Sequence, residues 1–558
     1  MVSGITWNPL GQPTGWSWNL PGSSTPIPAT RSYNTAGQLT ATEFSSYQYD
    51  AAGRINGITQ NLWQPASTNP QDSTLTQEAS AWTVQYSPTG RITSFTRTTA
   101  ANTPADTATF QYDANGNRKS STRNVAGTST SRTYSGEASH NRLLGFSQTT
   151  STGGNSASTS VTYQYNSAGD LLSDGLTSYH YDSEGRLDSA TTGGGADAPT
   201  TKYAHNALGQ RVFKTEPLFS SAATPGTGKN LNNLLADDDE KEEGEQEPPG
   251  LIQQILNFWS KLWSPSTSDA EKLGWSYVYA EDGSLLGEYG SGGSASSGTG
   301  QYIYLPTASG PMPIAAIIKG QTYAIHSDHL NTPRRLTQAD GQAAWQWAYS
   351  AFGEEQPTTG AKRFTSEATT PSTGSTSIPE VTFNLRYPGQ YFDSETKLHY
   401  NHFRSYSPGM GGRYTQGDPI GLDGGWNRFG YVDADPLSYF DPDGLNKAFR
   451  NPRDLMLLEG GAGGGSLGGA DGPQDGIPAP GNSNLFIGPI RLTILENYCL
   501  VKHLSRQTVS PSTTDQFLMT QALRGIGGEG TMAVIITDLV IQMMDLRTFP
   551  VLSNPTTI

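Results

Sequence analysis

The chain has 558 residues, of which 64 are Gly and 35 are Pro, and only 15 % are charged. A disordered chain would carry more charge and would lack the 26 Tyr, 18 Phe and 11 Trp found here, and a helical bundle would not contain so many turn formers. A formal net charge of -15 weighs against binding to nucleic-acid phosphates, so no nucleic-acid partner is predicted for the main body of the chain. The composition favours extended β-structure.

A short pattern recurs along the chain: an aromatic residue, Asp or Asn, two variable residues, Gly, a polar residue and usually an apolar one. The clear copies are YNTAGQL from Tyr33, YDAAGRI from Tyr49, YDANGNR from Tyr112, YNSAGDL from Tyr165 and YDSEGRL from Tyr181, and the looser ones are YSPTGRI from Tyr86, HNALGQR from His205 and YAEDGSL from Tyr279. The Asx side chain bonds the turn backbone and Gly accepts positive φ, so each copy predicts a β-hairpin. Alternation places Tyr163 and Tyr165 on one strand face and Gln164 on the other.

These hairpins resemble the tyrosine-aspartate (YD) repeats of the Rhs family, which also occur in insecticidal toxin-complex C subunits and in teneurins. The resemblance implies an all-β fold in which a spiralling antiparallel sheet forms a hollow shell or cocoon, with a small C-terminal tail of mixed or uncertain structure. Independent hairpins on a β-sandwich are the alternative.

Composition and motifs divide the chain into consecutive segments. The predicted segments are a repeat shell (1–221), an acidic insertion (222–274), further repeat hairpins (275–322), a core block (323–445), a Gly-rich linker (446–484) and a variable C-terminal cargo, commonly a toxin in the family (485–558). Within the insertion, LIQQILNFWSKLW from Leu251 predicts an amphipathic helix that packs on the shell or plugs it. A membrane-surface or partner helix is the alternative.

The core block carries the most specific signal. The stretches YAIHSDHLNTPRRLTQADGQ from Tyr323 and NLRYPGQYFDSETKLHYNHFRSY from Asn384 are similar to the Rhs-associated core. The block ends with DPIGL at 418–422 and DPDGL at 441–445, separated by 18 residues. Alone, each Asp-Pro-x-Gly is a turn, in which Gly421 or Gly444 takes the left-handed corner.

Together, the two motifs resemble the Rhs self-cleavage site, in which paired aspartates cut the chain just after the second copy. The resemblance implies that Asp418 and Asp441 are the catalytic pair and that the scissile bond joins Leu445 to Asn446. Two enclosed carboxylates cannot both ionise cheaply, so one would act as a base on water and the other as an acid. The cut would occur once per chain, as in a single-turnover aspartyl autoprotease.

Other polar residues near the two motifs are candidates for the same site. Arg413 is predicted to tune the pair or polarise the scissile carbonyl, and Asp423 and Asp435 are lesser candidates. No cofactor is predicted. No metal site is predicted either, because the two His-x-x-His pairs fall in apparent strands and lack an acidic or Cys ligand at characteristic spacing; the pairs are His326 with His329 and His399 with His402.

The tail contains no readable catalytic constellation. The lone Cys499 excludes an internal disulfide framework, and a small buried Cys beside a surface His503 is the favoured interpretation over a nucleophile and its base. His503 with Glu529 or Asp538 would suit a nuclease, but such separated acids are expected by chance. The activity of the tail stays open.

The favoured hypothesis is a bacterial Rhs-type polymorphic toxin, or its C-terminal portion, whose shell encloses the tail and frees it by self-cleavage during competition between bacteria. The resemblance implies three partners: the cargo itself, a secretion spike or delivery module, and an immunity protein. Secretion or surface display would need a dedicated system or an N-terminally longer chain, because the start lacks a standard secretory signal and no stretch approaches the ~20 apolar residues of a membrane span. The rival hypothesis is a cell-surface or wall-associated adhesion protein that binds carbohydrate and is not cleaved.

Overall fold

The computed structural model describes residues 1–69, 72–98, 104–137, 139–195, 198–219, 272–365 and 376–449. The chain divides into two compact units, Met1–Gly465 and Ser466–Ile558, and every described residue lies in the first. The helix expected from Leu251, the acidic run and the tail beyond Phe449 lie outside the described residues. The described part is antiparallel β-structure with two short 3-10 turns, so the all-β prediction is confirmed.

Two large sheets follow the order of the sequence, and each strand pairs with the next one along the chain. The first sheet consists of β1 (Val2–Trp7), β2 (Pro13–Trp18), β3 (Ile27–Tyr33), β4 (Leu39–Thr42), β5 (Ser45–Tyr49), β6 (Ile55–Pro65), β7 (Leu75–Tyr86), β8 (Ile92–Thr98), β9 (Pro104–Tyr112), β10 (Arg118–Val125), β11 (Thr128–Gly136), β12 (Leu143–Thr152) and β13 (Asn155–Thr162). The second consists of β14 (Gln164–Tyr165), β15 (Leu171–Ser173), β16 (Thr177–Tyr181), β17 (Leu187–Thr192), β18 (Thr200–His205), β19 (Arg211–Thr215), β20 (Gly274–Tyr279), β21 (Leu285–Gly290), β22 (Thr299–Thr307), β23 (Gly310–Ile318), β24 (Gln321–Ser327), β25 (Pro333–Thr337), β26 (Ala343–Gln346) and β27 (Thr358–Thr359).

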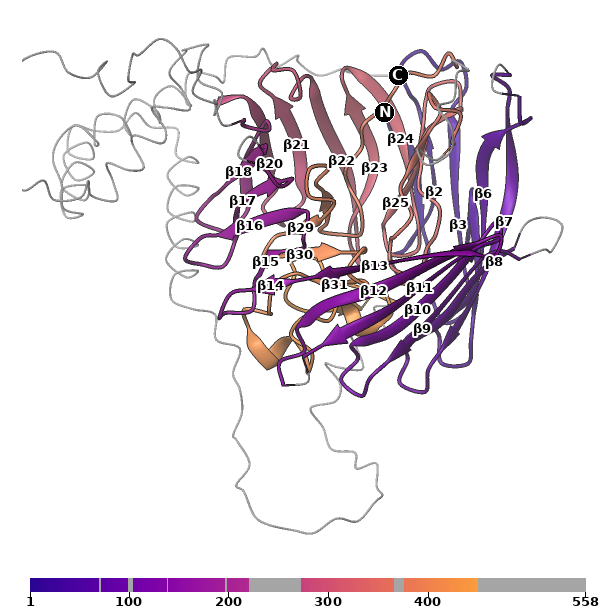
Figure 1. Cartoon of the computed structure of the whole chain (residues 1–558). Helices are drawn as coiled ribbons and strands as arrows, with labels where there is room; N and C mark the ends of the chain where they lie inside the picture. Colours follow the sequence, from indigo (N-terminus) through magenta and orange to yellow (C-terminus); the bar gives the residue numbers. More distant parts are fainter. Residues whose placement is uncertain are drawn as a thin grey trace, which may run out of the picture. The chain divides into compact units, whose positions relative to one another are not determined.

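The rest of the core block forms small elements that lie between strands of the two large sheets (Figure 1). These elements are β28 (Tyr391–Phe392), β29 (His399–Asn401), β30 (Arg404–Ser407), β31 (Arg413–Tyr414), η3 (Gly421–Gly424), η4 (Val432–Ala434), β32 (Tyr439–Phe440) and β33 (Ala448–Phe449). Strands β28–β31 form one sheet, and β32 pairs with β33. Short strands joined by long irregular segments are expected where a chain packs in the interior instead of forming a continuous sheet.

The repeat turns share one hydrogen-bond pattern. In the copy at Tyr49, the Asp50 N–H donates to the Arg54 carbonyl, and the Asp50 Oδ1 accepts from the N–H groups of Ala52 and Arg54. Gly53 has a φ of 80°, which a side chain would strain. The same backbone closure occurs outside the copies quoted above, for example from Asn8 to Gln12, Asp328 to Thr332 and Gln338 to Gln342, and the first of these also fits the sequence pattern from Trp7.

The repeat tyrosines connect consecutive repeats. Five of their hydroxyls, and that of Tyr304 outside the quoted copies, donate to a backbone carbonyl on the strand that leaves the preceding turn, over 2.7–2.9 Å; the Tyr181 hydroxyl does not make this bond. The pairs are Tyr49 with Leu39, Tyr86 with Ile55, Tyr112 with Ile92, Tyr165 with Leu143, Tyr279 with Arg211, and Tyr304 with Leu285. The half-buried ring therefore packs against the core while its hydroxyl connects two hairpins.

The inner faces of both sheets pack against the core block. Tyr349 shares a hydrophobic cluster with residues of β4–β9, and its hydroxyl lies 2.9 Å from that of Tyr47. Leu398 and Met410 pack against residues of the chain between Tyr134 and Tyr203. The predicted face assignment is confirmed, because Tyr163 is buried, Tyr165 is half-buried and Gln164 is exposed.

A buried ion network fixes the core block to the second sheet. Arg211 and Lys214 of β19 contact the Asp393 carboxylate at 2.6 and 3.1 Å, and Lys214 also contacts Glu395 at 3.2 Å. Although burial alone would raise the pKa of Asp393, these two cations hold it below its ordinary value. A charge so enclosed is tolerated only while its partners are present.

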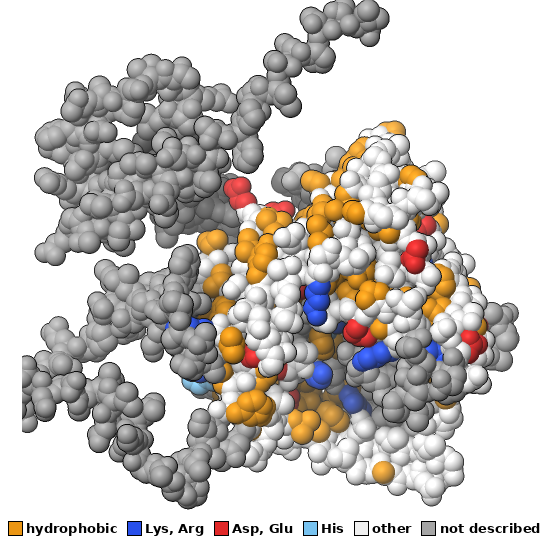
Figure 2. All heavy atoms as spheres, turned by 90° about the horizontal axis from the view of Figure 1, so that it is seen from above, with side chains coloured by type: hydrophobic (Ala, Val, Ile, Leu, Met, Phe, Trp, Pro, Cys, Tyr) orange, Lys and Arg blue, Asp and Glu red, His pale blue; other side chains and the backbone are white. Residues whose placement is uncertain are grey.

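One face of the molecule carries few charged side chains (Figure 2). Figure 2 shows one face, on which scattered apolar side chains lie among polar groups and few charged ones. The large apolar residues with the greatest exposure are Trp426, Leu176, Leu208, Phe219 and Leu422. Among the described residues there is no helix whose length and apolarity would let it cross a bilayer.

We predict that Asp393→Ala lowers the free energy of unfolding by about 3–5 kcal/mol, because Arg211 and Lys214 would stay buried without their carboxylate. Urea unfolding followed by tryptophan fluorescence measures the change. The control is Asp188→Asn, which removes an exposed partner of His180 and should cost less than about 1 kcal/mol. Equal effects of the two substitutions would contradict a structural role for the buried network.

Candidate functional site

The Arg404 guanidinium is the centre of a buried charged cluster. Arg404 is the first residue of β30, directly after the tight turn from β29, and it is 3 % exposed. Its Nη2 lies 2.9 Å from the Asp418 Oδ2 and 3.3 Å from the Asp441 Oδ2. The structure thus brings the two predicted aspartates to one nitrogen atom, although they are far apart in the sequence.

The carbonyl group of the predicted scissile bond lies at the same guanidinium. The Arg404 Nη2 is 3.5 Å from the Leu445 carbonyl oxygen, and its Nε donates to the Gly444 carbonyl. Gly424 lies on the opposite side, where a methyl group in place of its hydrogen would overlap the Asp418 Oδ2 and sit 2.8 Å from the Leu445 oxygen. Carboxylates, a guanidinium and the peptide carbonyl therefore converge on one small space.

Asp441 organises the turn that carries this peptide. Its Oδ1 accepts from the N–H groups of Gly444 and Leu445, at 2.9 and 3.1 Å. Its Oδ2 accepts from the Tyr414 hydroxyl at 2.8 Å, in addition to its contact with Arg404. Asn401 donates to the Tyr414 oxygen at 2.7 Å, so the hydroxyl proton points to Asp441.

The other side of the peptide is held as well. Ala448 of β33 pairs with Phe440 of β32, which closes the segment 441–447 into a loop with the Leu445–Asn446 bond inside it. The Lys447 ammonium forms an ion pair with Asp433 and lies 5.2 Å from the centre of the Tyr439 ring. Both flanks of the bond are thus fixed by the folded chain.

Burial shapes the protonation of both aspartates. Loss of solvent is the largest effect on Asp441 and raises its pKa to about 6, against the opposing effects of Tyr414 and Arg404. Burial also raises the pKa of Asp418, while Arg404 and the Ile420 N–H oppose the shift. A raised pKa makes each of these carboxyl groups easier to protonate than an exposed aspartate.

The remaining predicted residues lie elsewhere. Arg413 donates to the Asn141 carbonyl and its guanidinium lies 5.1 Å from the centre of the Phe429 ring, so its observed contacts do not include the two aspartates. The position expected of Arg413 is taken by Arg404, which the sequence analysis missed. Asp423 is exposed on η3, and Asp435 is buried near η4. Gly421 and Gly444 adopt the predicted positive φ, at 68° and 78°.

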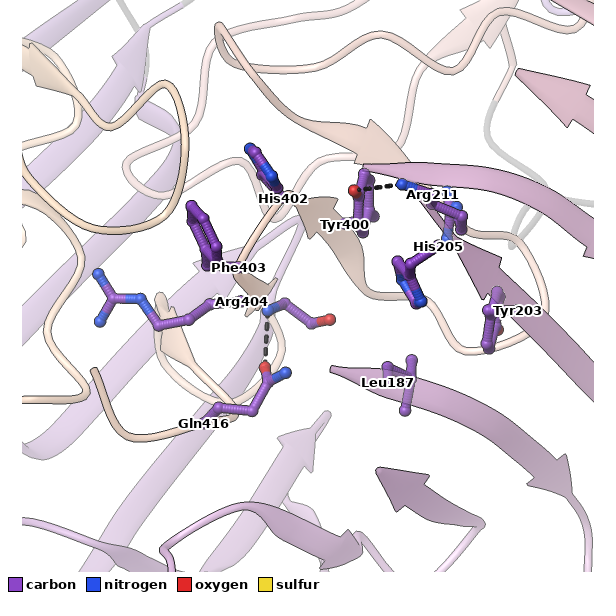
Figure 3. Close-up of a pocket in the computed structure, with 10 residues that line it drawn as sticks. Leu187, Tyr203, His205, Arg211, Tyr400, His402, Phe403, Arg404 and Gln416 are labelled. Atoms are coloured by element: carbon purple, nitrogen blue, oxygen red, sulfur yellow. Dashed lines mark hydrogen bonds between the residues drawn. The ribbon is translucent and has the colours of Figure 1, made fainter. Parts of the chain in front are cut away.

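A small cavity lies next to the charged cluster, which it contacts through Arg404. Its volume is about 10 Å³, room for about one water molecule. It is lined by residues of β17–β19 and of the β29–β30 turn, among them Tyr203, His205, Tyr400 and Arg404 (Figure 3). The Arg404 side chain extends away from His205 in this view. Burial, and next the nearby Arg211, lowers the pKa of His205 to about 4, so this ring is neutral at physiological pH.

The four histidines of the His-x-x-His pairs make separate contacts. His326 lies between Glu43 and Thr337, and His329 contacts the Leu437 carbonyl. His399 contacts the Gln390 side chain, and His402 the Leu208 carbonyl. Within the described ranges, no group of three or more His, Cys, Asp or Glu is arranged to hold a metal ion.

No protein-family model matches the chain. The double-stranded DNA deaminase toxin A of Burkholderia cenocepacia is 27 % identical over 267 residues, which are 48 % of this chain and 15 % of that protein. The toxin protein Tse5 of Pseudomonas aeruginosa is 34 % identical over 143 residues, 24 % of this chain and 9 % of that one. The probable deoxyribonuclease RhsA of Dickeya dadantii is 35 % identical over 127 residues, 23 % of this chain and 8 % of that one. The chain spans less than a sixth of each of these relatives.

Solved structures align with a larger share of this chain than these relatives do, at lower sequence identity. A crystal structure of TcdB2-TccC3-Cdc42 aligns with 79 % of this chain and 20 % of its own, at 16 % identity and a TM-score of 0.48. A Photorhabdus luminescens Tc holotoxin pore aligns with 80 % of this chain and 20 % of its own, with the same identity and TM-score.

The described residues form a repeat β-protein of tyrosine-linked hairpins, with a core block that ends in two Asp-Pro motifs. The chain is Rhs-related, as its matches to the toxin protein Tse5 and to the probable deoxyribonuclease RhsA of Dickeya dadantii show.

We predict that Asp435 makes the protein less stable as the pH rises. Asp435 is 2 % exposed, and burial raises its pKa to about 7, above its value in the unfolded chain. The folded state therefore favours the protonated form, and this contribution is lost as the pH rises from about 4 through about 7. Between pH 5 and pH 8 the loss is about 3 kcal/mol.

The substitution Asp435→Asn should flatten this decline, which urea unfolding at both pH values measures. Asp423→Asn, at an exposed position, serves as the control and should leave the pH dependence unchanged. If Asp435→Asn shows the same decline as the original chain, ionisation of Asp435 is not its cause.

Proposed function

We propose that this chain is part of an Rhs-type polymorphic toxin and cuts itself once, between Leu445 and Asn446. The observation that carries the proposal is the position of Arg404, whose Nη2 lies near Asp418, Asp441 and the Leu445 carbonyl oxygen together. A guanidinium at that oxygen would stabilise the negative charge that develops when water attacks the carbonyl carbon. An acid and a base within the same cluster supply the proton transfers.

The proposed reaction depends on enclosure rather than on substrate binding. The turn from Asp441 to Leu445 and the β32–β33 pairing hold the peptide in place, so no second molecule has to be captured. After one cut the peptide no longer exists, and the site has no further substrate. The chain is therefore proposed as a single-turnover autoprotease.

The wider role follows from the relatives. Relatives named as toxins, such as Tse5, support a toxin role, and we propose that the segment released from Asn446 carries the cargo in residues 485–558. The shell would enclose the cargo, a delivery module would export both from the bacterium, and an immunity protein would protect the producer. Two relatives are described as probable deoxyribonucleases and one as a DNA deaminase, so the target of this tail stays open.

A second candidate is a surface-associated adhesion protein that binds carbohydrate and is not cleaved. The specific observation in its favour is the exposure of aromatic side chains, above all Trp426, which is 88 % exposed. Flat aromatic faces at a surface suit sugar rings. This candidate predicts an intact chain of 558 residues.

We predict that freshly folded chain yields a 113-residue fragment that begins at Asn446. Cell-free synthesis followed by gel electrophoresis and N-terminal sequencing measures the cut and avoids toxicity of the tail. Asp418→Asn and Asp441→Asn should leave the chain uncut over the time in which the original is processed. A new terminus at Pro419 or Pro442 would indicate acid breakage of an Asp-Pro bond instead. Normal processing of both variants would refute the assigned pair.

We predict that Arg404→Lys slows the cut by about 100-fold, because a single ammonium cannot contact two carboxylates and two carbonyl groups in the geometry of the guanidinium. A pulse-chase experiment on labelled full-length chain measures the rate. Arg413→Lys is the matched control and should cut at nearly the original rate. The opposite order of the two variants would return the role to Arg413.

A further inference from the structure

We infer that the two aspartates have different roles, with Asp418 as the catalytic residue that transfers protons and Asp441 as a positioning residue, and that Gly424 keeps open the space for the attacking water. This inference rests on the proposed self-cleavage. The inference gives the two carboxylates different roles in the cleavage. It also requires that position 424 carry no side chain.

The hydrogen bonds of Asp441 leave it little capacity for a further partner. Its Oδ1 accepts from Gly444 and Leu445, and its Oδ2 accepts from Tyr414 and Arg404. A carboxylate offers about four acceptor positions, so donors already occupy both oxygens of Asp441. Its contacts hold the turn and the guanidinium, and they leave no oxygen directed at a water molecule.

Asp418 has the opposite arrangement. Within the described part of the chain, its Oδ1 accepts from the Ile420 N–H at 3.1 Å and its Oδ2 contacts Arg404 at 2.9 Å. Acceptor capacity therefore remains on both oxygens. The Oδ2 and the Leu445 carbonyl oxygen both face Gly424, because a methyl group on that glycine would overlap the first and stand 2.8 Å from the second. Asp418 is thus the carboxylate that can bind a water molecule next to the scissile carbon.

Gly424 is needed for space and not for backbone conformation. Its φ lies outside the left-handed range, so alanine would fit the local backbone without strain. However, an alanine methyl would collide with the Asp418 Oδ2 and press on the Leu445 oxygen. Gly424 and Leu445 are half-buried and Asn446 is exposed, so water can reach this space from solvent.

The step balances with water as the only co-reactant. The ionised Asp418 takes a proton from the water while the water oxygen bonds to the Leu445 carbonyl carbon. Arg404 faces the resulting oxyanion. Asp418 then gives this proton to the Asn446 nitrogen, the C–N bond breaks, and a carboxylic acid and an amine are left. Asp418 ends in the state in which it began.

The charges that face Asp418 fit both states. Arg404 and Arg428 favour its ionised form, and Asp443 and burial favour its protonated form. The Arg428 guanidinium donates to the Asp418 backbone carbonyl at 3.0 Å, and Asp441 lies across Arg404. Opposing influences of this kind suit a group that must accept and return one proton.

The test compares asparagine with alanine at each aspartate in pulse-chase experiments on full-length chain. Asparagine keeps an acceptor oxygen for the turn but cannot take up a proton, so a positioning residue should tolerate it better than a proton-transfer residue. For Asp441, we expect asparagine to cut about 10- to 100-fold slower than the original on prolonged chase, and alanine to be slower still. For Asp418, we expect both substitutions to abolish the cut. Equal rates for the asparagine and alanine variants of Asp441, or a measurable rate for Asp418→Asn, would overturn the division of roles.

Gly424→Ala tests the space directly. We expect it to slow the cut at least 100-fold while the chain still unfolds cooperatively in urea, whereas Gly409→Ala, at an exposed glycine where the methyl would meet no atom closer than 3.9 Å, should cut normally. Equal rates for the two alanine variants would overturn the role of Gly424. Failure of the original chain to cut at Leu445 would instead overturn the proposed function, so the two failures are distinguishable.

Discussion

The structure depends on one repeated interaction, the hydrogen bond from a tyrosine hydroxyl to a carbonyl of the preceding repeat. A hairpin alone is marginal in water, because two strands bury too little apolar surface to offset the loss of conformational entropy. Tyr49, Tyr86 and Tyr112 each pack a half-buried ring against the core and bond to the strand before them. Each hairpin is therefore stabilised by its neighbour, and a long sheet can follow the sequence order without crossovers.

The sheets in turn determine what the core block can do. Its strands are short, and strands β29–β31 are buried throughout. Their conformation therefore depends on the two large sheets against which the core block packs. Close approaches leave little freedom: a side chain at Gly389 would collide with the Pro442 carbonyl, and one at Gly444 with the Asn401 carbonyl. The turn that carries Leu445 is thus pressed against the segment that supplies Arg404. Ion pairs in so enclosed a place keep their geometry because no solvent competes for them.

Much of this arrangement could be predicted from the sequence, for reasons that are local. The Asx and Gly of each repeat act within five residues, so the hairpins and their inward rings could be read directly. The turn at Asp328 was missed because Asn331, with a φ of 65°, stands where the pattern requires Gly. Asp418 and Asp441 stood out because each begins a turn motif. Arg404 did not, since nothing in its neighbourhood distinguishes it from other arginines and its partners lie in other segments; Arg413 was chosen for its closeness in sequence to Asp418.

The same dependence gives the proposed cut a built-in order. Arg404 follows β29, Asp418 precedes η3, and Leu445 follows β32, so the cluster exists only after these segments have packed on the two sheets. An unfolded or partly folded chain would hold the aspartates apart, with ordinary pKa values and an unpolarised carbonyl. Enclosure would then be a precondition of cleavage and not its consequence. A chain of this design would release its C-terminal segment only when the surrounding sheet is complete, because the sheet and the reaction share the same buried contacts.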